Sequence, residues 1–175
     1  KTISIINSPD NKFRIFNWQL FSETGTIRYF GAIQMNSKKE LVLFPLFDNS
    51  AFTGNIEDTV LDANKWFGNL YYNIIRKKKY YILFGWDGNN LASNIKIIDV
   101  LTFDNEKKPL FGAPIFVFGD KSVKTRVLIE FKENAAVSLN YNVDEKMIIF
   151  DHLVPEFGDS TAKWTFVPDG SYEGF

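Results

Sequence analysis

The chain has 175 residues, of which 45% are hydrophobic and 23% charged, so we expect a core of its own within one domain spanning residues 1–175. The formal net charge of −1 argues against a general nucleic-acid binder, because such binding depends on clustered Lys and Arg. No cysteine is present, which excludes disulfides, thiolate nucleophiles and Cys-ligated zinc. Aromatic residues make up 17% of the chain, including 18 Phe, and this excess favours strands.

Alternating apolar and polar positions predict a series of antiparallel strands. In chain order the predicted strands are 2–6, 12–21, 26–35, 40–47, 69–76, 80–86, 94–103, 110–118, 123–132, 135–142, 146–154 and 163–167. Turn-forming residues fill the links at 8–11, 23–25, 36–38, 104–106, 119–120 and 144–145. The two-residue link 133–134 predicts that the strands on either side of it form a hairpin. Together these signals predict an all-β fold, an antiparallel β-sandwich or flattened β-barrel of consecutive hairpins.

One short helix is predicted in the longest irregular stretch, residues 47–66. Thr59 and Asp62 have the spacing of a capping box, with an acid three residues after a hydroxyl. Gly68 is suited to end such a segment.

Several predicted strands are apolar at both odd and even positions, which is unusual for a strand with one face in water. They are residues 41–47, 80–84, 110–118 and 147–154. Two explanations are open: curled sheets bury the central strands on both sides, or part of this surface meets a partner or ligand. The first is favoured because large exposed apolar patches are rare.

The turn that contains Trp86, Asp87, Asn89 and Asn90 is the most distinctive local motif. A Trp beside short amide and carboxylate side chains is suited to bind a sugar, by stacking on C–H faces and bonding hydroxyls. Turn chemistry alone also explains every residue type present and is the favoured interpretation. The turn lacks the regular oxygen ligands and terminal Glu of an EF-hand, so no calcium site is predicted.

Asp99 and His152 are the other candidate site residues. Asp99 lies on an otherwise apolar face, where an acid must be paired, hydrogen-bonded or shifted in pKa. Backbone amides or an Arg are its favoured partners. His152 is the only histidine, so a multi-histidine zinc site is excluded. Because adjacent strand residues point to opposite faces, His152 and Asp151 should not share a pocket, and a hydrogen-bonded structural histidine is favoured over a general base.

Other catalytic or phosphate-binding signals are weak. The Gly-x-Ser-x-Gly elbow, the Gly-rich phosphate loop and the dinucleotide fingerprint are absent from the sequence. The basic run of residues 76–79 lies where a hairpin reverses, and lysines there are typical of a solvated turn that discourages edge pairing.

Six runs together form a recognisable pattern: residues 65–68, 86–90, 96–101, 111–116, 150–153 and 167–172. This pattern resembles a family of uncharacterised exported bacterial proteins. The resemblance spans about residue 65 to the end and implies a bacterial protein exported to the periplasm or cell surface, with no known activity. A chain that begins with Lys1 and not Met is consistent with a removed signal peptide or a trimmed chain.

The predicted function is a non-catalytic binding or interaction domain that binds a glycan or another protein through exposed aromatic residues. The predicted ligand-binding residues are Trp86, Asp87, Asn89, Asn90, Asp99 and His152. The alternative is a hydrolase acting on a saccharide or ester, with Asp99, Asp151 or His152 in a cleft. No cofactor, metal or nucleic-acid partner is expected. No membrane span is expected either, since no apolar run approaches the ~20 residues of a membrane helix.

Overall fold

The computed structural model describes residues 3–22, 26–52 and 54–175, and over these ranges the protein is an all-β assembly of antiparallel sheets. The predicted turn at 23–25 lies outside the described residues. The N-terminal sheet contains, in spatial order, β1 (Ser4–Asn7), β2 (Phe13–Phe21), β3 (Ile27–Met35) and β4 (Leu43–Phe47). No sheet closes into a barrel within these ranges, so the sandwich form of the prediction is the one observed.

The central sheet has the order β5-β9-β8-β7-β6, and β12 pairs beside β9 with the long strand β8. Its strands are β5 (Leu61–Asp62), β6 (Leu70–Arg76), β7 (Tyr81–Asp87), β8 (Ser93–Phe103), β9 (Pro109–Phe111) and β12 (Val127–Lys132). A small ribbon of β10 (Phe116–Val117) and β11 (Val123–Lys124) lies between β9 and β12 in the chain.

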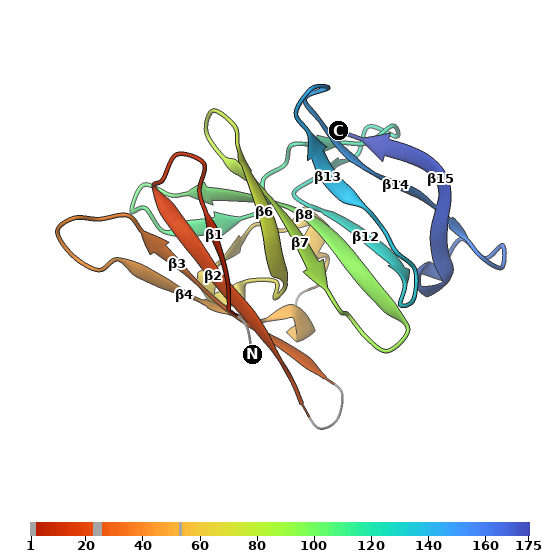
Figure 1. Cartoon of the computed structure of the whole chain (residues 1–175), viewed down its shortest axis with the longest axis horizontal. Helices are drawn as coiled ribbons and strands as arrows, with labels where there is room; N and C mark the ends of the chain where they lie inside the picture. The colour runs from red at the N-terminus through yellow and green to blue at the C-terminus, as the bar shows by residue number, and fades with distance from the viewer. Residues whose placement is uncertain (1–2, 23–25, 53) are drawn as a thin grey trace.

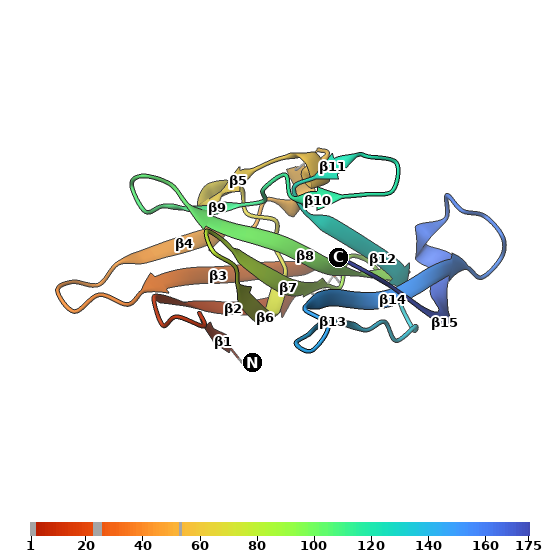
Figure 2. The ribbon, with the colours of Figure 1, turned by 90° about the horizontal axis from the view of Figure 1, so that it is seen from above.

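The C-terminal sheet contains β13 (Leu139–Asn142), β14 (Met147–Pro155) and β15 (Phe166–Gly174) in that order. Figures 1 and 2 show that this sheet and the N-terminal sheet of β1 to β4 lie on opposite sides of the central strands. The molecule is therefore layered, with the central sheet between the other two.

Two hydrophobic cores occupy the two faces of the central sheet, because successive strand residues point to opposite sides. Leu83 and Ile97 belong to the core shared with the N-terminal sheet. Ile82 and Ile98 belong to the core shared with the C-terminal sheet. Burial on both faces explains why residues 80–84 are apolar at every position. The outer side of β4 differs, since Leu43 and Phe47 remain exposed.

The predicted hairpin between 123–132 and 135–142 is wrong. β12 pairs with β8, and β13 pairs with β14. The N-terminal half of the long strand β8 needs a partner on the side away from β7, and the alternation of β12 matches it, with Val127 opposite Ile98. The chain then leaves the central sheet and enters the next layer. Thr125 and Arg126 interrupt the predicted strand and are both buried.

The predicted helix at Thr59 is also wrong, because Leu61 and Asp62 form β5. Asp62 instead caps the 3-10 turn η3 (Ala63–Lys65), accepting hydrogen bonds from the amides of Asn64 at 2.8 Å and Lys65 at 3.1 Å. The remaining helical segments are the 3-10 turns η1 (Ser50–Phe52), η2 (Ile56–Asp58) and η4 (Lys163–Thr165). Across the described ranges, no helix has the length and hydrophobicity needed to cross a bilayer.

Candidate functional site

The Trp86 turn is a closed hydrogen-bonded structure. Asp87 is buried and its Oδ1 accepts from the Tyr29 hydroxyl at 2.8 Å and from the Asn89 amide at 2.8 Å. The Tyr29 oxygen in turn accepts from the Gly88 amide at 2.8 Å. Trp86 is half-buried and packs against the core of the C-terminal sheet. This geometry supports the turn interpretation, since Asp87 is engaged within the fold.

The two asparagines of this turn are engaged as well. Asn89 Nδ2 donates to Ser93 Oγ at 2.8 Å, and Asn90 Oδ1 accepts from the Ala92 amide at 2.7 Å. Ser93 Oγ donates a hydrogen bond to Glu130 Oε1 at 2.6 Å, which connects the turn to β12. Burial is the main cause that raises the pKa of Asp87 above its ordinary value, and the bonds from Asn89 and Tyr29 offset part of that shift.

Asp99 forms the buried ion pair that the sequence suggested, and its partner is Arg126. The Nε–Oδ1 distance is 3.1 Å, and the two side chains are 0% and 1% exposed. Asp99 Oδ2 accepts from the Tyr71 hydroxyl at 2.9 Å, and its Oδ1 accepts from the Val100 amide at 2.8 Å. Burial, and then the charge of Asp99, raise the pKa of Tyr71 well above its ordinary value.

The other donors of Arg126 hold irregular backbone in place. Its guanidinium donates to the carbonyl of Phe111 at 3.0 Å, of Thr59 at 3.0 Å and of Ile56. The Arg126–Asp99 pair thus joins β8, β9 and the segment around η2, and every carboxylate oxygen has a partner inside the protein. This is a structural network that leaves no group for a ligand.

His152 lies in the C-terminal sheet, where its Nδ1 is 2.9 Å from Asp169 Oδ2 and its Nε2 is 3.6 Å from Glu173 Oε1. Both acids come from β15 and were not among the predicted site residues. Asp151 faces elsewhere and accepts from the Ser138 amide at 2.7 Å, which agrees with the alternation expected of strand neighbours. The amide and hydroxyl of Ser171, and then His152, lower the pKa of Asp169 to about 2.

The predicted site residues therefore do not share one pocket. The β7–β8 register places Asp87 opposite Ile95 and Asp99 opposite Leu83. The two acids are four residues apart along the strands, or about 13 Å at the usual rise per residue. That separation exceeds the roughly 5 to 10 Å between the carboxylates of a glycosidase. Among the described residues, no three His, Asp or Glu side chains gather as metal ligands.

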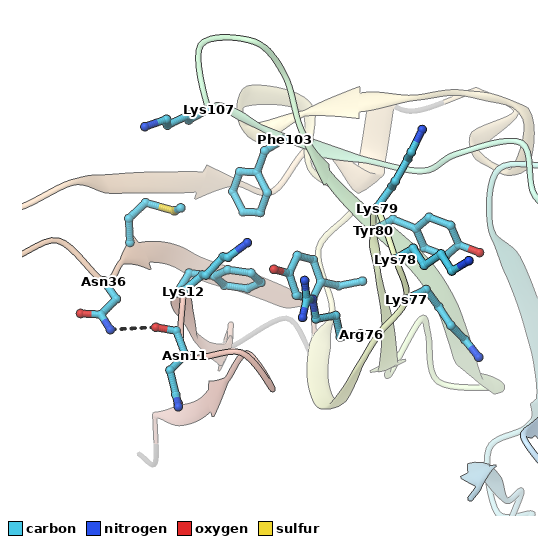
Figure 3. Close-up of a pocket in the computed structure, with 13 residues that line it drawn as sticks. Asn11, Lys12, Asn36, Arg76, Lys77, Lys78, Lys79, Tyr80, Phe103 and Lys107 are labelled. Atoms are coloured by element: carbon cyan, nitrogen blue, oxygen red, sulfur yellow. Dashed lines mark hydrogen bonds between the residues drawn. The ribbon is translucent and has the colours of Figure 1, made fainter.

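A cleft that the sequence did not predict lies where four hairpin turns meet. It encloses about 570 Å³ and is shown in Figure 3. The β1–β2 turn contributes Asn11 and Lys12, and the β3–β4 turn contributes Asn36. The end of β6 and the β6–β7 turn contribute Arg76, Lys77, Lys78 and Lys79, and the β8–β9 turn contributes Lys107. We call this site the basic cleft.

Local hydrogen bonds hold two of these turns in shape. Asn11 and Lys107 both adopt left-handed backbone, with φ of 56° and 62°, a conformation that Asn tolerates better than most residues. The Asn11 amide donates to the Ser8 carbonyl at 2.9 Å, and the Lys107 amide donates to the Asp104 carbonyl at 3.0 Å. These bonds fix the positions from which Lys12 and Lys107 extend.

The floor of the basic cleft is aromatic. The Phe13 ring packs edge-on against Tyr81, with centroids 4.8 Å apart, and against Phe103 at 5.3 Å. Phe13 and Tyr81 are buried, while Phe103 and Met35 are half-buried and line the cleft. The floor is therefore packed against the core and offers an apolar surface beneath the charges.

One acid, Asp10, lies beside the basic cleft and already has partners within the protein. Its Oδ2 accepts from the Tyr81 hydroxyl at 2.8 Å and pairs with Arg76 at 3.2 Å and Lys12 at 3.5 Å. Burial alone would raise the pKa of Asp10, but the Tyr81 hydroxyl, Ser8 and the Arg76 charge hold it below its ordinary value. Burial and the bond to Asp10 raise the pKa of Tyr81 to about 12.

The cations of the basic cleft outnumber their internal partners. Lys77 lies over the Tyr141 ring at 4.9 Å. Within the described ranges, Lys78, Lys79 and Lys107 form no ion pair. The site therefore keeps an excess of positive charge on a protein whose formal net charge is −1. Sequence reasoning missed it because Lys12 and Lys107 are far in the chain from the 76–79 run. The three predicted turns were the available signal, but their meeting depends on how the sheets stack.

No protein-family model matches the chain, and no match is found among curated proteins or solved structures. The resemblance to exported bacterial proteins, and export itself, therefore stay predictions.

Proposed function

We propose that the protein is a non-catalytic binding domain that holds an acidic glycan in the basic cleft. The observation that carries this proposal is that six cationic residues from three hairpins line one cleft with an apolar floor. Like charges gathered in this way repel one another, and an anionic ligand relieves that repulsion.

The type of cation favours a ligand with several anionic groups. Five of the six are lysines, which act as flexible point charges, whereas a single carboxylate or phosphate is best held by the planar fork of Arg. The one Arg, Arg76, is already paired with Asp10. A polymer of uronate or sulfated sugar rings supplies repeated charges to flexible lysines.

The floor favours rings over a plain anion. Phe103 and Met35 present apolar surface between the charges, and the C–H face of a sugar ring can pack on such a surface. Acidic polysaccharides are extracellular polymers, so export to the periplasm or cell surface is part of the same proposal. Catalysis is not proposed, and the separation of Asp87 from Asp99 along the paired strands β7 and β8 supports that choice.

Calorimetric titration with polygalacturonate and heparin tests the proposal, with neutral dextran as the uncharged comparison. We expect binding that weakens as salt rises from 50 to 500 mM, because exposed charges are screened. The double variant Lys79→Glu/Lys107→Glu should bind at least tenfold more weakly.

The matched control is Lys121→Glu/Lys146→Glu. It makes the same change in net charge, and both lysines are exposed with left-handed backbone like Lys107. Equal loss of affinity in the two double variants would show that net charge, and not the cleft, governs binding. Absence of binding to either polyanion, or stronger binding to single-stranded nucleic acid, would also reject the proposal.

A further inference from the structure

The outer face of the N-terminal sheet is apolar across all four strands. Inward residues of these strands, such as Ile15 and Ile33, belong to the core shared with the central sheet, so the positions between them face outward. The strand register aligns the central outward residues in two rows across the sheet. The first row is Trp18, Phe30 and Phe47, and the second is Ile5, Phe16, Ala32 and Pro45. All seven are apolar, and none of them is buried.

The largest side chains of these rows are open to solvent. Phe47 is 57% exposed and Ile5 is 51% exposed. Trp18 and Phe30 are half-buried, and their rings stack with centroids 5.6 Å apart and planes 11° apart. Contiguous apolar surface of this kind is uncommon on a protein that works alone and marks an interaction site. We call this surface the aromatic face.

The charges around the aromatic face are all positive. Arg14 and Arg28 lie on outward positions at opposite ends of the rows, since β2 and β3 are antiparallel. The Arg14 guanidinium lies over the Phe16 ring at 4.9 Å, and its Nε donates to Gln34 Oε1 at 2.8 Å. The outward positions of the described strands β1 to β4 carry no Asp or Glu. The face therefore complements a partner that is both apolar and anionic.

The size of the aromatic face argues against a protein partner. Four strands and the six residues from Arg14 to Leu20 give a footprint of about 14 by 20 Å, or roughly 300 Å². A stable protein interface buries about 800 Å² on each side. A second copy of the chain would also bring its arginines to a face without acids, so charge disfavours self-association as well.

The chemistry of the rows argues against a sugar. Sugar hydroxyls require several hydrogen-bonding groups, and the only one in the two rows is the indole N–H of Trp18. A lipid bilayer needs no such directional partners. It takes up apolar side chains at its boundary, favours Trp there because the ring is apolar with one polar edge, and attracts Arg through its phosphates.

We infer that the aromatic face is a docking surface for an anionic lipid bilayer, with Trp18, Phe47 and Ile5 at the acyl boundary and Arg14 and Arg28 beside lipid phosphates. In this arrangement the protein lies on the bilayer and does not cross it. The inference does not depend on the proposed function, because no residue of the two rows lines the basic cleft.

Co-sedimentation of the whole chain with vesicles of equal parts phosphatidylglycerol and phosphatidylcholine tests the inference, with phosphatidylcholine vesicles as the uncharged comparison. We expect binding to the anionic vesicles and a blue shift of tryptophan emission as Trp18 leaves water. Ile5→Thr/Phe47→Thr should bind at least tenfold more weakly, because it removes exposed apolar surface. Its melting temperature should stay the same, since both side chains are exposed and Thr suits strands.

The arginines are tested separately. Arg14→Gln/Arg28→Gln should weaken binding to the anionic vesicles by about fivefold for each Arg. The matched control for the apolar variant is Val117→Thr/Val123→Thr, which changes an exposed cross-strand pair of the β10–β11 ribbon and should bind vesicles like the unaltered chain. Ile5→Thr/Phe47→Thr should bind polygalacturonate like the unaltered chain, which separates this test from that of the basic cleft.

Four results would overturn the inference. The first is no co-sedimentation with the anionic vesicles, and the second is equal loss of vesicle binding in the two Thr double variants. The third is vesicle binding that Lys79→Glu/Lys107→Glu abolishes and Ile5→Thr/Phe47→Thr retains, which would assign it to the basic cleft. The fourth is a dimer in analytical ultracentrifugation, or binding to cellulose, that Ile5→Thr/Phe47→Thr abolishes, which would assign the face to a second copy or to a sugar.

Discussion

Two carboxylates of this protein pair with arginine, and their surroundings give them different roles. Asp99 and Arg126 are both sealed between sheets, and each oxygen and donor group of the pair bonds inside the protein. Asp10 and Arg76 lie at a turn, with the Arg side chain 47% exposed and lysines beyond it that have no ion pair within the described ranges. The buried pair is a closed network, whereas the turn pair is one part of a cluster with excess positive charge. The two pairs therefore differ in whether the charge around them is matched inside the protein.

Replacing Arg126 should have the largest effect on this comparison. Arg126→Met leaves the Asp99 charge buried without a cation and removes the donors to three backbone carbonyls, so we expect a loss of about 3 to 5 kcal/mol in unfolding free energy. Urea unfolding followed by circular dichroism measures it. Arg28→Met, at an exposed arginine, is the control and should change stability by under about 0.5 kcal/mol. Equal stability of the two variants would mean that the buried pair does not hold the fold.

Replacing Asp10 should lower the stability of the protein moderately and raise its affinity for polyanions. Asp10→Asn removes the acid held by Tyr81 and Arg76, and we expect a loss of about 1 kcal/mol at pH 7, since the site is partly open to solvent. The same change leaves the basic cleft one charge more positive, so polyanion affinity should rise about two- to fivefold. Lower affinity would contradict the assignment of the cleft as an anion site.

The pH dependence of the stability difference between the unaltered chain and Asp10→Asn follows from the lowered pKa of Asp10. A folded pKa below the unfolded value means that the carboxylate stabilises the fold above the unfolded pKa, and that this contribution is lost as pH falls through the folded pKa. The stability gap between the unaltered chain and Asp10→Asn should therefore be full near pH 7 and shrink as the pH falls below the unfolded pKa of about 3.9. A stability gap that persists in acid would show that packing, and not the charge of Asp10, causes it.

Replacing Asp87 should have the smallest effect, because this acid is buried and no cation among the described residues pairs with it. Its pKa is raised by burial, so its ionised form opposes folding increasingly as pH rises above the unfolded pKa. The carbonyl oxygen of Asn can still accept from Tyr29 and Asn89, and we expect Asp87→Asn to gain about 0.5 kcal/mol at pH 7 and nothing at pH 3. Thermal melts at both pH values measure this. Destabilisation at pH 7 would show that the charge itself is needed in the turn.

Local sequence patterns were reliable guides to what each residue does within its own strand. The apolar positions Ile82 and Leu83 indicated a strand buried on both faces, and both are buried. The apolar neighbours of Asp99 indicated an acid that needs a partner. These inferences depend only on the alternation of side chains along extended chain, which is a property of the backbone.

Which distant segments meet was decided by the tertiary structure. The short link 133–134 predicted that β12 forms a hairpin with the strand that follows it, but β12 pairs with β8 instead. Nothing local indicated that Arg126 would reach Asp99, or that Lys12, Lys79 and Lys107 would border one cleft. The physical reason is that backbone stereochemistry acts between neighbouring residues, whereas sheet order and stacking follow from how all the apolar faces are buried together.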